Sequence, residues 1–161
     1  MQLTVAHIGA KSAKAGVKSG FETLTRLYLD RIAPYHPVQT EVFRSEADFL
    51  DSVTRPRSSG KSGRVPALLV LLDSRGKLLS SPDFATWLGA RRDQGAQHLI
   101  FAIGPADGWS EEARASAAPS GGMLLSFGPI TLPHELARLV LAEQLYRACT
   151  ILAGHPYHSG H

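Results

Sequence analysis

Cysteine is nearly absent from this sequence: Cys149 is the only one in 161 residues, which excludes an internal disulfide. This scarcity favours a reducing, cytoplasmic setting. Long apolar runs are also missing, because the longest ones, at residues 67–72 and 99–103, have the length of strands and not the roughly 18 residues of a membrane span. The first residues lack the charged start and long apolar stretch of a secretory signal. We therefore expect a cytoplasmic protein with no membrane segment.

Neither sign of charge dominates, since 17 basic and 14 acidic residues leave a formal net charge of +3. The pI of about 9.2 permits nucleic acid as a partner without requiring it. Hydrophobic residues make up 43% of the composition, which is enough for a packed core. The length suits one domain, and we expect residues 1–161 to form it.

Short apolar runs alternate with amphipathic stretches along the chain. The spacing of Phe21, Leu24 and Leu27 predicts a helix over Gly20–Ile32, and Ser45 with Asp48 predicts the start of the next one. The expected strands are Gln2–Ile8, Val38–Phe43, 67–73, His98–Ile103 and 122–127, and the other helices are 81–92, 110–117 and 135–153. Strands that alternate with helices indicate an α/β fold with a mostly parallel sheet.

The segment 55–64 differs from its surroundings, since four of its ten residues are basic and five are glycine or serine. This composition predicts a flexible surface loop outside the core. A solvated linker is the favoured interpretation, and a basic arm that contacts RNA phosphates stays open.

Three expected strand ends, at residues 72–76, 104–108 and 127–133, contain glycine or proline at the place where parallel sheets bind ligands. Each one alone is typical of an ordinary strand-to-helix turn, and none carries a nucleotide-binding fingerprint. Asp73 lies in the first of them. It is either a general base at a strand end or, as we favour, a cap for the turn that follows.

The last expected helix, 135–153, is apolar on most of its sides, which indicates burial on more than one side and possible cover by a second subunit. Arg138 falls in its apolar sector, where a charge needs a partner or a wet site. Glu143 and Arg147 have the spacing of an ion pair, and an ordinary surface pair is as good an interpretation as a functional one.

The tail contains His155, His158 and His161, which raises the hypothesis of a metal site. We disfavour this hypothesis, because the tail contains no carboxylate side chain and its Ser-Gly sequence predicts a flexible end. Tyr157 and His158 are better suited to stack on and hydrogen-bond a splayed RNA base. No spacing indicates a hydrolase arrangement of nucleophile and base.

Several stretches resemble one known family. Residues 131–134, 142–148 and 155–158 look like the corresponding parts of the RlmH family, bacterial pseudouridine-N3 methyltransferases of the SPOUT class that act on large-subunit ribosomal RNA. Residues 71–77, 103–110 and 3–9 are also similar. The resemblance spans nearly the whole chain and is most specific in the last third.

The resemblance implies a parallel-sheet α/β SPOUT fold with a C-terminal trefoil knot, a homodimer, and S-adenosylmethionine as cofactor, with no metal. It implies that the target is a pseudouridine in a stem-loop of 23S ribosomal RNA. We expect the substrate to be the assembled ribosome or large RNA, because a small dimer with this charge offers little basic surface for holding naked RNA. The implied cofactor-binding residues are Leu72, Gly104, Phe127, Gly128, Pro129, Ile130, Thr131 and Leu132. Glu143, Arg147, Tyr157 and His158 match the family's substrate-placing catalytic residues, and Arg138, Arg147, Tyr157 and His158 are the expected RNA contacts. The general base stays unassigned.

The chain departs from the family pattern in three places. Pro105 replaces a second glycine, segment 55–64 replaces a charged helix, and the tail ends in residues 159–161 without a basic residue. These departures keep two alternatives open: a knotted RNA-binding protein without methyl transfer, and a related SPOUT methyltransferase with another RNA target. A metal-dependent hydrolase built on the tail histidines comes last.

Overall fold

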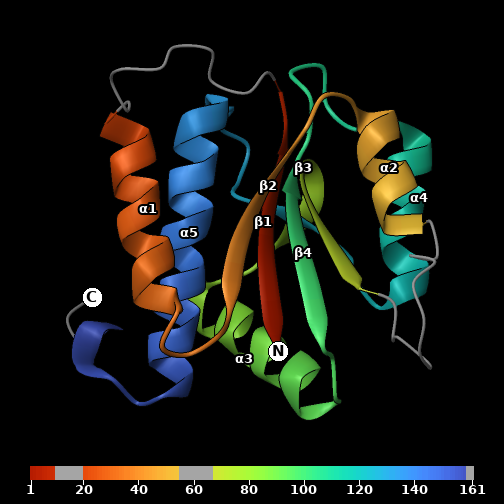
Figure 1. Cartoon of the computed structure of the whole chain (residues 1–161). Helices are drawn as coiled ribbons and strands as arrows, with labels where there is room; N and C mark the ends of the chain where they lie inside the picture. The colour runs from red at the N-terminus through yellow and green to blue at the C-terminus, as the bar shows by residue number, and fades with distance from the viewer. Residues whose placement is uncertain (10–19, 55–66, 159–161) are drawn as a thin grey trace.

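The computed structural model describes residues 1–9, 20–54 and 67–158 (Figure 1). The loop prediction for 55–64 lies outside these residues. The strands are β1 (Gln2–Ile8), β2 (Val38–Phe43), β3 (Leu68–Leu78), β4 (His98–Ile103) and β5 (Met123–Ser126). The helices are α1 (Gly20–Ile32), α2 (Glu46–Thr54), α3 (Ser81–Asp93), α4 (Glu111–Ala117) and α5 (His134–Leu152), with short 3-10 turns η1 (Ala118–Ser120) and η2 (Pro156–His158). None of these helices is long and apolar enough to cross a membrane.

The five strands form one sheet in the order β2-β1-β4-β3-β5, and every neighbouring pair is parallel. The predicted α/β fold with a parallel sheet is therefore confirmed. A helix lies between successive strands, which returns the chain to the same end of the sheet each time. All carboxyl ends consequently meet at one edge, at the top of Figure 1.

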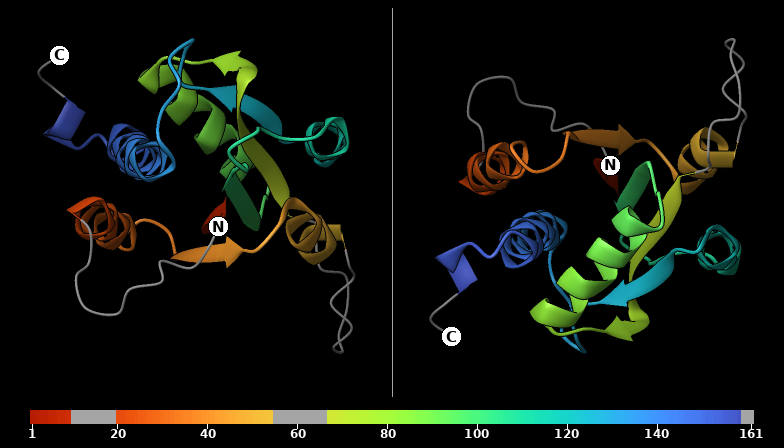
Figure 2. Two further views of the ribbon diagram at one scale, coloured as in Figure 1. Left: turned by 90° about the horizontal axis from the view of Figure 1, so that it is seen from above. Right: turned by 90° about the horizontal axis from the view of Figure 1, so that it is seen from below.

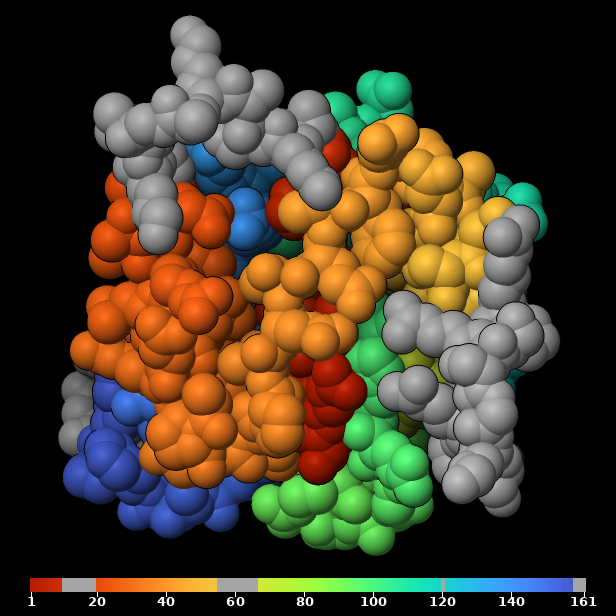
Figure 3. Space-filling model, viewed as in Figure 1, coloured from red at the N-terminus to blue at the C-terminus, as the bar shows by residue number. Residues whose placement is uncertain are grey.

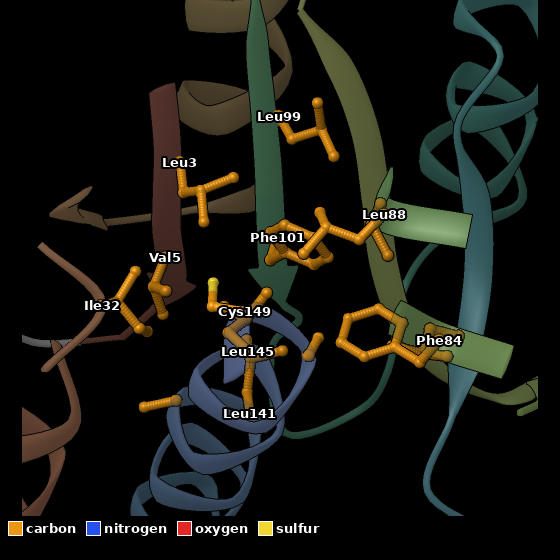
Figure 4. Close-up of a cluster of buried hydrophobic side chains, with 14 of the residues drawn as sticks. Leu3, Val5, Ile32, Phe84, Leu88, Leu99, Phe101, Leu141, Leu145 and Cys149 are labelled. Carbon is orange, nitrogen blue, oxygen red and sulfur yellow. The ribbon is translucent and has the colours of Figure 1, made fainter. Parts of the chain in front are cut away.

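Helices cover both faces of the sheet, which makes three layers (Figure 2). On one face, α1, α3 and α5 enclose a core that includes Val5, Leu88, Phe101 and Leu145 (Figure 4). On the other face, α2 and α4 enclose a second core around Phe49. Strands buried on both faces carry continuous apolar runs, which explains the unbroken hydrophobic pattern of β4.

Helix α5 lies between α1 and α3 and packs on the sheet with Leu141, Leu145 and Cys149. The predicted burial on more than one side is confirmed. The chain's own helices provide much of the cover that the sequence had assigned to a second subunit. Burial also raises the pKa of the Cys149 thiol to about 11.

Strand β3 is longer than the 67–73 predicted from its apolar run. Its pairing with β5 shifts register between Leu72 and Lys77, both of which pair with Leu125. Residues 73–76 therefore form a bulge inside the strand, because pairing with β5 resumes after the turn. Apolar periodicity could not predict this extension, since four of the five added residues, 74–78, are exposed.

Candidate functional site

A cavity of about 750 Å³ lies at the carboxyl edge of the sheet, and we call it the strand-end cavity. Its lining comprises residues 72–74, 103–109, 114, 125–134 and 137. All eight residues predicted to bind a cofactor are among them, contributed by the ends of β3 and β4 and by the segment between β5 and α5. The structure thus brings together loops that each looked ordinary in the sequence.

Gly128 gives the wall after β5 its shape. Its φ of +106° lies in a region that side chains disfavour, and an added Cβ would meet nothing within 4 Å. The hydroxyl of Ser126 accepts a hydrogen bond from the Gly128 amide at 3.1 Å, which holds this turn. The backbone at Gly128 is therefore open to close approach by a ligand.

Pro105 stands where the related pattern has glycine, and the local backbone accommodates it. The Gly108 amide donates to the Pro105 carbonyl at 2.9 Å and closes a tight turn. Ser110 then caps α4 by accepting from the Ala113 amide at 3.1 Å. The segment between β4 and α4 is therefore a closed, hydrogen-bonded turn with proline at its first corner.

Asp73 uses both carboxylate oxygens within the fold. Oδ1 accepts from the Arg75 amide at 2.8 Å and Oδ2 from Arg114 Nε at 2.7 Å. Burial works to raise the pKa of Asp73, but these hydrogen bonds and the two guanidinium charges outweigh it and lower that pKa. An ionised, fully engaged carboxylate is a poor general base, so the turn-capping prediction is confirmed.

Glu143, Arg147 and Tyr157 form a second group on α5 and η2, which we call the tail cluster. Arg147 donates to Glu143 Oε1 from Nη2 at 2.6 Å and from Nε at 3.0 Å, and Tyr157 Oη donates to the same oxygen at 3.3 Å. The predicted ion pair forms, and it is half-buried, with side chains 20% and 18% exposed. Burial, with Tyr28 and Glu143 nearby, raises the pKa of Tyr157, which remains a neutral hydrogen-bond donor.

Tyr157 also belongs to a cluster that includes the other three tyrosines of the chain. Tyr146 is central, with ring centroids 4.7 Å from Tyr157, 6.1 Å from Tyr28 and 6.5 Å from Tyr35. The Arg147 guanidinium lies 5.2 Å from the Tyr157 ring centroid. Sequence reasoning missed this tyrosine cluster, because its members come from α1, the turn after it, α5 and η2.

Arg138 lies apart from the tail cluster. It donates to Glu22 Oε2 on α1 at 3.2 Å, and its side chain is 14% exposed, so the expected partner exists. Its charge also reaches His7 at the end of β1, whose pKa falls to about 4 through burial first and then through Arg138 and His134, against the opposing charge of Glu22. Among the predicted RNA contacts, the structure therefore joins Arg147 and Tyr157 through Glu143 and gives Arg138 a different partner, Glu22.

The tail histidines occupy different situations. His155 Nδ1 accepts from the Tyr157 amide at 3.1 Å. His158 contributes backbone to η2, and His161 lies outside the described residues. Within residues 1–9, 20–54 and 67–158, no group of three or more His, Cys, Asp or Glu side chains is arranged to hold a metal.

The strand-end cavity borders the first turn of α5, whereas the tail cluster lies on the second half of α5 and on η2, which follows it. His134 and Ala137, in the first turn, line the cavity, whereas Arg147 lies roughly 15 to 20 Å further along at about 1.5 Å per residue. In the space-filling view, the C-terminal end of α5 and η2 lies below α1, away from the strand ends (Figure 3). One chain therefore does not bring the two predicted groups together.

Known proteins resemble this chain over its whole length. A family described as "Predicted SPOUT methyltransferase" matches residues 1–158. A protein of Koribacter versatilis (strain Ellin345) named "Ribosomal RNA large subunit methyltransferase H" is 48% identical over 161 residues, which is 100% of both chains. Its namesake in Xanthobacter autotrophicus is 41% identical over 167 residues, covering 98% of this chain and 99% of the relative.

Proposed function

Because this chain belongs to the SPOUT methyltransferase family, we propose that it transfers a methyl group from S-adenosylmethionine to N3 of a pseudouridine in large-subunit ribosomal RNA. The observation that carries the proposal is the gathering of all eight expected cofactor residues around one cavity. The names of the full-length relatives support the RNA substrate. We place the reaction in the cytoplasm, on the assembled ribosome.

The strand-end cavity fits the cofactor in size and chemistry. A volume of about 750 Å³ lies within the usual range for small-molecule sites. Its wall after β5 is mainly apolar and includes the open backbone of Gly128, which suits a neutral adenosine held by main-chain groups. When bound, S-adenosylmethionine supplies an electrophilic methyl group, so the protein's main task is to hold the reacting atoms in line.

The tail cluster is suited to hold the target base. Glu143 accepts from both Arg147 and Tyr157 and so orients their side chains. The Arg147 guanidinium keeps donors for a base or phosphate oxygen, since only Nε and Nη2 bind Glu143. Tyr157 stays protonated and offers its ring for stacking. His158 completes this set in the proposal.

A homodimer would unite the two groups. Since roughly 15 Å of α5 separates Arg147 from Ala137, the last residue of this helix that lines the cavity, we propose that the tail cluster of a second copy faces the cavity. Each active site would then combine the cavity of one chain with Arg147 and Tyr157 of the other.

Complementation between two strongly impaired variants tests this arrangement. Gly128→Val blocks the cavity and Arg147→Ala disables the tail cluster. Mixed dimers of the two variants contain one site with both intact parts, so mixing them should restore up to about a quarter of the wild-type rate under random re-association. No recovery in confirmed mixed dimers would contradict a shared site.

We also propose the trefoil knot of the family for the C-terminal segment. β5 lies at the edge of the sheet, whereas α5 packs over its middle strands, so residues 127–133 must cross the strand ends between them. A chain closed into a ring by joining its termini should, if knotted, migrate as a compact species on a denaturing gel. Migration as a simple ring would refute the knot.

The experiment that tests the function is methylation of ribosomes that lack the modification, with radiolabelled S-adenosylmethionine and mapping of the modified nucleotide. We expect one methyl group per ribosome, on a pseudouridine of the large-subunit RNA, and slower transfer to protein-free RNA. Cofactor binding without transfer would favour an RNA-binding role. Transfer to another nucleotide would identify a methyltransferase with a different target.

A further inference from the structure

Trp109, just before α4, connects two of the strand ends that line the strand-end cavity. Its indole Nε1 donates a hydrogen bond to the Leu72 carbonyl, at the end of the first part of β3, at 3.0 Å. Its ring lies directly against Gly104, where an added Cβ would come within 2.9 Å of Cε2 and Nε1. Gly104 is therefore limited to glycine by the indole as well as by any ligand.

The indole is itself held from the far layer of the fold. Trp109 is 3% exposed, and its ring centroid lies 5.4 Å from that of Phe49, a fully buried residue of α2. The next residue is tied to the same helix, because the Ser110 amide donates to Glu46 Oε2 at 3.0 Å. The indole therefore has a fixed position, set by α2 on one side and by β3 and β4 on the other.

We propose that Trp109 is a positioning residue for the methyl donor, an inference that rests on the proposed function. The indole N–H donates to the Leu72 carbonyl oxygen and so holds that carbonyl group in one orientation. Because Leu72 and Gly104 both line the cavity, Trp109 keeps their backbone groups in place before the ligand arrives. Such preorganisation strengthens binding by lowering its conformational cost.

The proposal distinguishes binding from chemistry. Trp109 acts through Leu72 and Gly104, so its loss should weaken donor binding and leave the rate at saturating donor nearly unchanged. Trp109→Phe is the informative change, because it keeps most of the ring and removes only the N–H. Loss of one hydrogen bond of this kind predicts roughly 3- to 10-fold weaker binding of S-adenosylmethionine and its demethylated product.

The matched control is Trp87→Phe. Trp87 is the only other tryptophan, lies on α3 and stacks on Phe84 away from the cavity lining. Calorimetric titration should give wild-type affinity for Trp87→Phe, a raised Kd for Trp109→Phe, and a kcat on ribosomes within about twofold of wild type for both. Equal Kd values for both variants would overturn the inference.

Fluorescence provides a second test, in which the unaltered Trp109 itself reports the binding of the ligand. In Trp87→Phe, Trp109 is the only tryptophan, and its emission should change saturably with the demethylated product at the calorimetric Kd. Emission from Trp109→Phe, which comes from Trp87, should stay constant. An unresponsive Trp109 in a protein that binds the product would contradict the proposal, whereas no binding by the wild type would refute the proposed function itself.

Discussion

Arg114 and Asp73, from α4 and the bulge of β3, form an ion pair with Nε and Oδ2 2.7 Å apart. The side chain of Asp73 is 4% exposed and that of Arg114 16%. This contact lies one residue beyond Leu72, whose carbonyl binds Trp109. The first turn of α4 and Trp109, two residues before that helix, are therefore tied to β3 at two consecutive positions, Asp73 and Leu72.

Asp73→Asn should lower the free energy of unfolding at neutral pH by about 1–3 kcal/mol, because a buried charged acceptor loses its charge beside Arg114. The folded pKa of Asp73 is below its ordinary value of 3.8, so its contribution is present above that value and is lost as the pH falls through the folded pKa. The difference between wild type and variant in urea unfolding should therefore shrink below pH 4. Asp93→Asn is the control, since its pair with Arg92 is exposed. An equally large decrease in the free energy of unfolding of Asp93→Asn would contradict a special contribution of the buried Asp73–Arg114 pair.

Gly128→Ala and Gly154→Ala form a matched pair. Both glycines have positive φ, +106° and +66°, with open space at the added Cβ. Each alanine should cost about 1–2 kcal/mol through backbone strain. Only Gly128 lines the strand-end cavity, so only its variant should bind S-adenosylmethionine more weakly in a calorimetric titration. Equal affinities in the two variants would exclude Gly128 from the cofactor site.

Arg147→Ala should lower kcat/KM for ribosome methylation by roughly 10- to 100-fold, because the variant loses one charge-assisted hydrogen bond to the RNA. The Kd for S-adenosylmethionine should not change, because Arg147 lies outside the cavity lining. Arg26→Ala is the control, since Arg26 pairs with Asp30 on an exposed face of α1. Weaker binding of S-adenosylmethionine together with an unaltered kcat/KM for ribosomes would contradict the assignment of Arg147 to the RNA substrate.

His7→Leu should make the protein less sensitive to mild acid. The unfolded chain takes up a proton at His7 near pH 6.5, but the folded protein does so only near its pKa of about 4. The free energy of unfolding of the wild type therefore falls as the pH decreases from 6.5 to 4, and the His7 part of this fall is absent in the variant. Melting temperatures at pH 7.5 and 5.0 measure it, and parallel losses in both proteins would contradict the buried neutral His7.

The local pattern of the sequence determined the elements of the fold. The bounds of β1, α1, β2 and β4 follow from apolar periodicity and from the residues that end each run, all of which act over a few positions. Ser45 caps α2, accepting from the Asp48 amide at 3.1 Å, and Asp73 caps its turn through equally local bonds. Contiguous stretches also carried the family resemblance, including the residues that line the strand-end cavity.

Only the tertiary structure decided which residues from distant parts of the sequence contact one another. Trp109 and Leu72 are 37 positions apart, and Arg114 and Asp73 are 41 apart, so no periodicity relates them. The tyrosine cluster and the extension of β3 along β5 likewise arise from contacts between distant segments. A hydrophobic pattern specifies which face of an element is buried, but the order of strands and the packing of helices choose its neighbours. The same packing places the strand-end cavity at the first turn of α5 and the tail cluster on its second half and on η2, a separation that residue identity alone does not reveal.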